Sequence, residues 1–191
     1  MTAITQPETT MTDQTGHQAI LDYWRALGPQ GWFRKDEAVD REIAERFGKL
    51  HAEASAGLLD HWRGEPGPCL ALVIILDQFS RNMFRGDARA FAQDALALQI
   101  AREAIAAGFD RQVDPVLRSF LLMPFMHSES IVDQQRAVAL FHALGAEGLK
   151  YAIIHRDVIA RFGRFPHRNA ALGRHTTRAE EAFLAAGGFS G

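Results

Sequence analysis

The basic segment HRDVIARFGRFPHRN, residues 155–169, gathers side chains that could recognise an anion. It holds two histidines, four arginines, one aspartate and one asparagine, in a chain whose formal net charge is -2. The planar fork of arginine matches carboxylate and phosphate oxygens, and histidine adds a donor or an acceptor near neutral pH. Between Lys150 and Arg178, the basic residues face a single acid, Asp157. This asymmetry favours either an anion-facing surface or ion pairs with acidic helices elsewhere.

Helical spacing predicts which residues of this segment lie in the core and which could form a site. His155 lies in register with apolar residues three and four positions further on, so we expect it in the core. Asp157 and Arg161 are four residues apart with the acid first, which predicts a salt bridge. The exposed candidates that remain are Arg164, His167, Arg168 and Asn169.

A second polar segment, HSESIVDQ at residues 127–134, offers acid–base groups. His127 and Glu129, together with His167, are the candidates for proton transfer, and the carboxylate could tune His127 toward neutral pH. A His-x-Glu pair also suits zinc or iron, but two ligands do not make a site, and spacing cannot add Asp133 or His155. We therefore predict no metal and no cofactor. Capping of the next helix is the simpler interpretation of Ser, Glu and His at this junction.

The third segment, LDQFSRNMFRG at residues 76–86, places polar residues directly after an apolar run. Asp77 and Arg81 are four residues apart and can pair on one helix face. A buried ion pair is costly unless it is fully hydrogen-bonded. We favour an ion pair that ties the central helix to its neighbours over a pocket wall that also includes Asn82.

Buried charges need one another, so we expect the three segments to meet in one polar cleft. The predicted ligand-binding residues are Asp77, Arg81, Asn82, Arg161, Arg164, Arg168 and Asn169. The predicted acid–base groups are His127, Glu129 and His167. The alternative is a structural polar core, with the function on the outer surface.

Bulk properties bound the class of protein. A chain of 191 residues fits one domain, and we expect a flexible polar tail over residues 1–16 and a single all-α domain over residues 17–191. The slightly acidic balance argues against nucleic acid as a partner. The longest apolar run, residues 69–76, is far shorter than the about 20 residues that span a membrane. The single cysteine, Cys69, excludes an internal disulfide. We predict a cytoplasmic protein.

Helical periodicity dominates the chain. Apolar stripes predict helices over residues 36–57, 90–107 and 149–163. Asp36 and Gly57 suit the two ends of the first of these helices. Another helix should start at Asp114, and Pro124 should end or kink it. Ser130 with Asp133 resembles a capping box at the start of a further helix. Thr176 or Thr177 opens a last helix.

Residues 70–84 are ambiguous because β-branched residues also suit a buried strand. The apolar spacing continues at helical steps for longer than a typical strand, and no partner strand exists, so we predict a central buried helix. The fold class is therefore all-α, with about eight to ten antiparallel helices stacked as helix-turn-helix pairs. A faint repeat, LDYWR at 21–25 and LDHWR at 59–63, fits such stacking weakly.

The three polar segments, in this order, resemble the bacterial family known as domain of unknown function 924. Trp24, Trp32 and Phe33 are similar as well, and the likeness extends from about residue 20 to residue 184. The resemblance implies an all-α, tetratricopeptide-like fold and no particular activity. Ser80 stands where the family pattern has proline.

The predicted function is that of a binding module whose Arg/His cleft takes an anionic small molecule or an acidic peptide. The alternative is a hydrolase or lyase that acts on a phosphorylated or carboxylated small molecule. No P-loop, GxSxG or HExxH motif decides between them, and the oligomeric state is left open.

Overall fold

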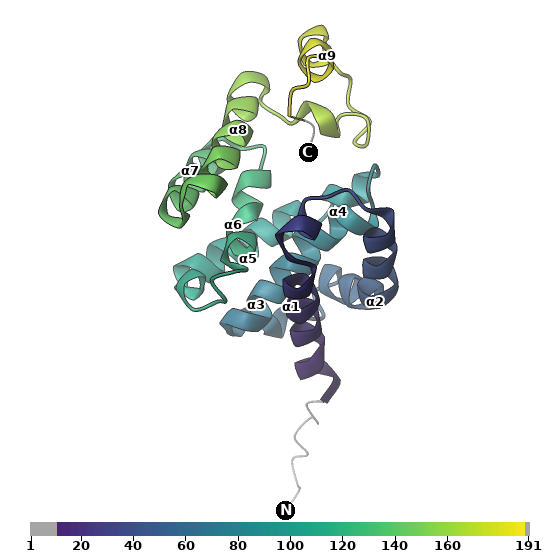
Figure 1. Ribbon diagram of the computed structural model, residues 1–191, viewed down its shortest axis with the longest axis vertical. Helices are drawn as coiled ribbons and strands as arrows, with labels where there is room; N and C mark the ends of the chain where they lie inside the picture. Colours follow the sequence, from purple (N-terminus) through teal and green to yellow (C-terminus); the bar gives the residue numbers. More distant parts are fainter. Residues whose placement is uncertain (1–10, 190–191) are drawn as a thin grey trace, which may run out of the picture.

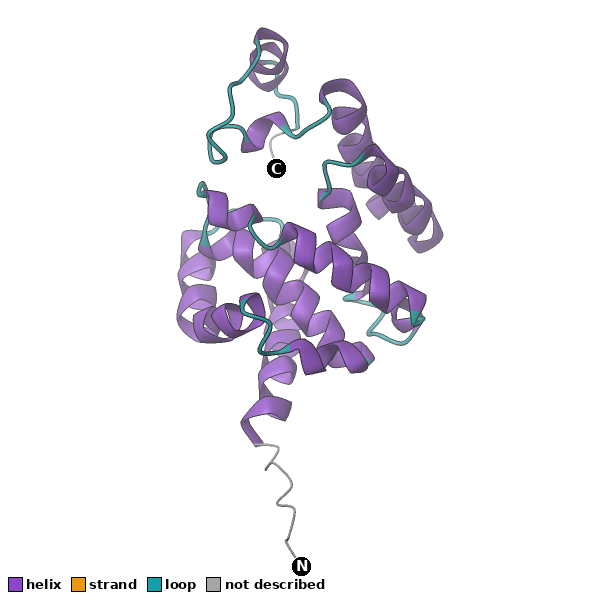
Figure 2. Ribbon diagram, turned by 180° about the vertical axis from the view of Figure 1, so that it is seen from behind, coloured by secondary structure: helices purple, strands orange, loops and turns teal. Residues whose placement is uncertain are grey.

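The structure, a computed structural model, describes residues 11–189, and every regular element in that range is helical (Figure 2). The all-α class is thus confirmed. The α-helices are α1 (Met11–Trp32), α2 (Glu37–Ser55), α3 (Pro66–Ile74), α4 (Ser80–Met83), α5 (Asp94–Ala106), α6 (Arg118–His127), α7 (Ile131–Leu144), α8 (Ala146–Phe162) and α9 (Arg178–Ala185). A π-helical turn, η2 (Ile75–Phe79), joins α3 to α4, and the short 3-10 turns are η1 (Asp60–Gly64), η3 (Ala88–Phe91), η4 (Phe109–Arg111) and η5 (Pro166–Arg168).

Helix α3 lies in the core and packs against α1, α5 and α6 (Figure 1). Helices α6, α7 and α8 follow one another along the chain, and each packs against the next, as helix-turn-helix pairs do. Helix α9 and η5 lie at one end of the molecule, whereas the first turns of α1 lie at the other. A tetratricopeptide-like repeat stays a prediction. No helix within residues 11–189 combines the length and the apolar character needed to cross a membrane.

The predicted central helix is confirmed. Residues 70–76 are all at most 1% exposed, so this run is apolar and buried all round, as a helix through the middle of a core should be. Around its end, Phe79 contacts Tyr23, Trp24 and Phe47, with ring centroids 5.1–6.3 Å apart. These aromatic contacts fix the position of the π-helical turn that carries Asp77.

Several helix ends match their sequence signals. The Asp36 carboxylate accepts from the Ala38 N–H and caps α2, and Gly163 ends α8 with a positive φ of 70°. Thr177 and Glu180 form a reciprocal capping box at the start of α9, which decides between the two predicted threonines. Helix ends that depend on local contacts between a side chain and the nearby backbone could therefore be predicted from the sequence.

Other local predictions are wrong. Helix α6 starts at Arg118, whereas Asp114 caps only a preceding turn through the Val116 N–H. Pro124 does not end the helix, which continues to His127, and the alternative of a kink stays a prediction. The Ser130 side chain makes no capping bond; Asp133 instead turns inward and accepts from Ser128. The predicted tail stays a prediction: residues 1–10 lie outside the described residues, and residues 11–16 form the start of α1.

Candidate functional site

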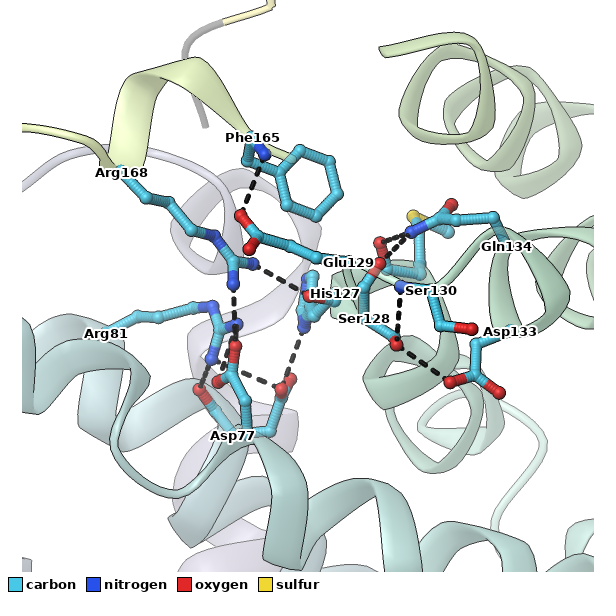
Figure 3. A network of polar contacts seen from close by, with 12 residues as sticks. Asp77, Arg81, His127, Ser128, Glu129, Ser130, Asp133, Gln134, Phe165 and Arg168 are labelled. Atoms are coloured by element: carbon cyan, nitrogen blue, oxygen red, sulfur yellow. Dashed lines mark hydrogen bonds and ion pairs between the residues drawn. The ribbon is translucent and has the colours of Figure 1, made fainter. Parts of the chain in front are cut away.

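A buried polar network forms where the π-helical turn, α4, α5, α6 and η5 meet (Figure 3). The Asp77 carboxylate has no exposed surface, and it accepts from His127 Nδ1 at 2.8 Å and from Gln78 Nε2 at 2.6 Å. The Arg81 guanidinium lies 3.2 Å from the same carboxylate and donates to the Asp77 carbonyl. Asp77 is thus a fully paired buried charge, the arrangement that makes burial of a carboxylate tolerable.

Asp94, at the start of α5, links this centre to the C-terminal segment. Its carboxylate lies 3.0 Å from Arg81 and accepts from Arg168 at 2.9 Å. Arg168 also donates to the His127 carbonyl, so one arginine holds both α5 and the end of α6. The guanidinium of Arg168 lies 4.6 Å from the ring centroids of both Phe91 and Phe165.

A second set of ion pairs fastens the chain after α8. Glu129 accepts from the Phe165 N–H at 2.8 Å and from both terminal nitrogens of Arg174. Arg174 in turn donates to Asn169 Oδ1 and to the Phe165 carbonyl. Figure 3 shows Glu129 reaching from the α6–α7 connection toward the backbone of Phe165. These bonds hold η5 against the α6–α7 connection.

Arg164 is engaged elsewhere, in a two-pronged contact with Glu180 at 2.6 and 2.8 Å, and it also donates to the His175 carbonyl. The Arg164 and Thr177 contacts lower the pKa of Glu180 to about 2. Asn169 donates to the same carboxylate at 3.4 Å. Arg164 and Asn169 therefore position α9 in this structure.

Burial and the arginine charges control protonation at the network. Burial alone would raise the pKa of Asp77, but Arg81 and His127 hold it well below its usual range. Burial and Arg81 lower the pKa of His127, against the opposing effect of Asp77. Burial and the neighbouring positive charges also lower the pKa of His155 to about 3 and that of His167 to about 4. Asp77 is thus ionised, and His127, His155 and His167 are neutral, at neutral pH.

The tautomers of two of these histidines follow from their partners. His127 Nδ1 donates to the ionised Asp77, and His155 Nδ1 donates to the Tyr151 carbonyl, so each Nε2 carries a lone pair. The His155 ring is buried and packs against Phe165 and Phe189, as the helical spacing predicted. Among residues 11–189, no group of three His, Cys, Asp or Glu side chains is arranged to hold a metal ion.

The structure brings together part of the predicted set. Asp77, Arg81, His127 and Arg168 share one network, and Glu129, Arg164, His167 and Asn169 lie in the adjoining C-terminal contacts. Asn82 lies apart and donates to Asp40, which also pairs with Arg85.

Arg161 is not part of the network either. Its guanidinium lies over the rings of Phe162 and Phe183 on an exposed stretch of α8. The predicted Asp157–Arg161 salt bridge is wrong, because Asp157 pairs with its neighbour Arg156. Arg161 instead lies over two aromatic rings, and the adjacent Arg156 reaches the exposed carboxylate, an outcome that the four-residue spacing does not reveal.

Sequence reasoning missed Asp94 and Arg174. Asp94 opens a helix, where an acid is common for capping reasons alone, and Arg174 follows η5 in an irregular loop. The signal that could have found Arg174 is its place in the same basic stretch as Arg168. Nothing in the sequence around Asp94 marks its distant partner.

Replacing Asp94 with alanine should destabilise the protein by about 3–5 kcal/mol, because Arg81 and Arg168 then remain buried without their shared carboxylate. The matched control is Glu42→Ala, which breaks an exposed ion pair with Arg46 and should cost about 1 kcal/mol or less. Urea unfolding followed by circular dichroism measures both. Equal costs would contradict a stabilising role for the network.

Stability should fall as the pH drops from about 6.5 to about 4, because His155 and His167 stay neutral in the folded protein while the unfolded chain takes up protons. The unfolded state binds more protons throughout that window, so each such group contributes a slope of up to about 1.4 kcal/mol per pH unit. Urea unfolding at several pH values should give a shallower slope for His155→Phe. An unchanged slope would show that His155 accepts a proton without unfolding.

A solved structure of a protein of unknown function from Agrobacterium tumefaciens is similar to this chain, with 44% sequence identity and a TM-score of 0.88. The match covers 91% of this chain and 98% of that one. Comparison with curated proteins gives no match. The family model described as "bacterial protein of unknown function (DUF924)" matches residues 20–188. The resemblance inferred from the three polar segments is thus confirmed, and the chain belongs to this family.

Proposed function

We propose that the network around Arg168 binds a small molecule through a carboxylate or phosphate group. The observation that carries this proposal is a pair of buried nitrogens, Arg168 Nε and His167 Nδ1, that have no hydrogen-bond partner in the described part of the chain. Arg168 is 6% exposed, so its Nε–H lacks both a protein acceptor and bulk water. An unsatisfied buried donor costs about 1–3 kcal/mol, and a ligand oxygen would remove that cost.

Charge supports an anion at this place. Burial and Arg81 lower the pKa of Arg168 to about 10, although Asp94 and Glu129 oppose them. Burial is the main cause of this lowered pKa, and a bound anion would stabilise the charged form of the buried guanidinium. His167 stays neutral at neutral pH and can supply a second donor from Nδ1, since the tautomer of a neutral imidazole adapts to its partner.

A direct test is calorimetric titration with inorganic phosphate, acetate and citrate. We expect the parent protein to bind at least one of these anions, and His167→Ala and Arg168→Lys to weaken that binding about tenfold or more, a loss of about 1.4 kcal/mol. The matched control is Arg41→Ala, which removes an exposed arginine on α2.

Two results would contradict the proposal. One is a parent protein that is folded and binds none of the three anions, which would identify the network as a structural polar core. The other is binding that survives both site variants unchanged, which would place the anion elsewhere.

A second candidate function, a hydrolase or lyase for a phosphorylated or carboxylated molecule, rests on the Asp77–His127 pair. Asp77 orients the ring through Nδ1 and leaves the Nε2 lone pair able to accept a proton. The side chain of His127 is 14% exposed, so a substrate or water can approach it, and Arg168 contacts the same residue's carbonyl. A base beside an anion-binding arginine is the arrangement that such reactions use.

Turnover separates the two functions. If an anion that binds also carries a hydrolysable ester or a proton next to its carboxylate, we expect product by mass spectrometry. His127→Gln should then lower kcat at least about a hundredfold and leave binding within a few-fold of the parent. Product formed at the parent rate by His127→Gln would exclude His127 as the base, and binding without any product would favour the binding module.

A further inference from the structure

A surface hollow lies between α5 and α7, on residues that the polar network does not use. Its volume is about 370 Å³, and it is open to solvent. Ile105 and Arg102 of α5 line one side, Val132 and Arg136 of α7 line the other, and Phe125 of α6 contributes to the lining. The volume falls within the range of about 300–1,000 Å³ that is typical of ligand sites.

The hollow combines apolar lining with exposed aliphatic surface. Val132 is 68% exposed and its neighbour Ile131 is 39% exposed, although both stand on a helix with ample polar positions. One exposed aliphatic side chain is ordinary in a globular protein. Here the exposed valine borders a concave surface lined by Phe125 and Ile105, so an apolar side chain placed there would contact several residues at once.

Positive charge borders the apolar surface. The one carboxylate of the hollow, Asp133, is 5% exposed and is already paired with Arg102 and hydrogen-bonded by Ser128 Oγ. The Arg102 guanidinium also lies 5.3 Å from the Phe125 ring centroid, which holds it beside the hollow. Arg136 is exposed, and the described residues give its guanidinium no carboxylate partner. Within the described part of the chain, the positive charge of Arg136 at the rim therefore has no carboxylate partner.

We infer that this hollow is a docking surface for an acidic peptide segment of a partner protein. The bound peptide places one apolar side chain between α5 and α7, and its acidic side chains contact Arg136 and Arg102. The chemistry on each side is complementary: an apolar anchor against Phe125 and Val132, and acids against the arginine rim. A bidentate arginine–carboxylate contact gives orientation as well as attraction. The inference is independent of the anion site at Arg168.

Fluorescence anisotropy with a labelled Glu-Glu-Leu-Phe-Glu-Glu peptide tests the inference. We expect saturable binding by the parent protein, weaker at higher salt, and at least about tenfold weaker for Arg136→Glu and for Val132→Asp. Both side chains are exposed, so the variants should fold. The matched control is Arg41→Glu, an exposed arginine on α2 without a carboxylate partner among the described residues, which should bind like the parent.

The peptide controls separate charge from apolar contact. Replacing the four glutamates with glutamines should abolish binding, and replacing Leu-Phe with Ser-Ser should weaken it about tenfold. Absence of binding by the parent, equal binding by Arg136→Glu, or equal binding of the Ser-Ser peptide would overturn the inference. A dimer in sedimentation that Arg136→Glu dissociates would also overturn it, because a second copy of the chain would then occupy the hollow.

Discussion

Burial of one carboxylate, that of Asp77, constrains the arrangement around it. An ionised group without exposed surface is tolerable only where cations and donors surround it, and this requirement brings Arg81 and His127 into contact with the central helix. Arg81 also pairs with a second carboxylate, that of Asp94 on α5, and Asp94 in turn pairs with Arg168 of η5. A single buried charge thus fixes the relative positions of α4, α5, α6 and the C-terminal segment.

The central core and the C-terminal part of the molecule are held together by different forces. Around α3, a continuous apolar core of aliphatic and aromatic side chains supports the helices. Toward the C-terminus, the buried apolar cluster is small and separate: it consists of Val158 and Ile159 of α8 and of Phe165, with Phe162, Phe183 and Phe189 packed against it. There the ion pairs of Glu129 and Glu180 supply much of the attachment. The proposed anion site around Arg168 lies between the apolar core and the C-terminal part that is held by ion pairs.

Sequence patterns predicted the helices well where the deciding contacts are local. Asp36, Gly163 and the Thr177 capping box act within a few residues, and the length of the apolar run settled residues 70–84 as helix. The prediction that Pro124 ends the helix failed because the packing of six buried neighbours in α6 outweighs the loss of one backbone hydrogen bond. The capping box predicted for Ser130 and Asp133 does not form because the Asp133 carboxylate pairs with Arg102 of α5 instead.

The candidate site was predictable only in part, for a physical reason. Asp77 and Arg81 could be predicted as site residues because they are charged residues on an otherwise apolar helix. Arg168 could be predicted because it lies in a strongly basic stretch of the sequence. Their common partner, Asp94, is indistinguishable in sequence from an ordinary helix-opening acid. Asn82 and Arg161 share the composition of the site but lie on other helix faces, where Asp40 and the aromatic rings of Phe162 and Phe183 engage them.

The alternation of charge from Asp77 through Arg81 and Asp94 to Arg168 also limits which substitutions this chain can tolerate. Each inner member contacts an opposite charge on both sides, so reversing any one pair would place like charges together at its borders. An exposed pair such as Glu42–Arg46 can be exchanged by two independent substitutions. In the buried series, by contrast, the signs of all four charges would have to be exchanged together to keep every contact between opposite charges.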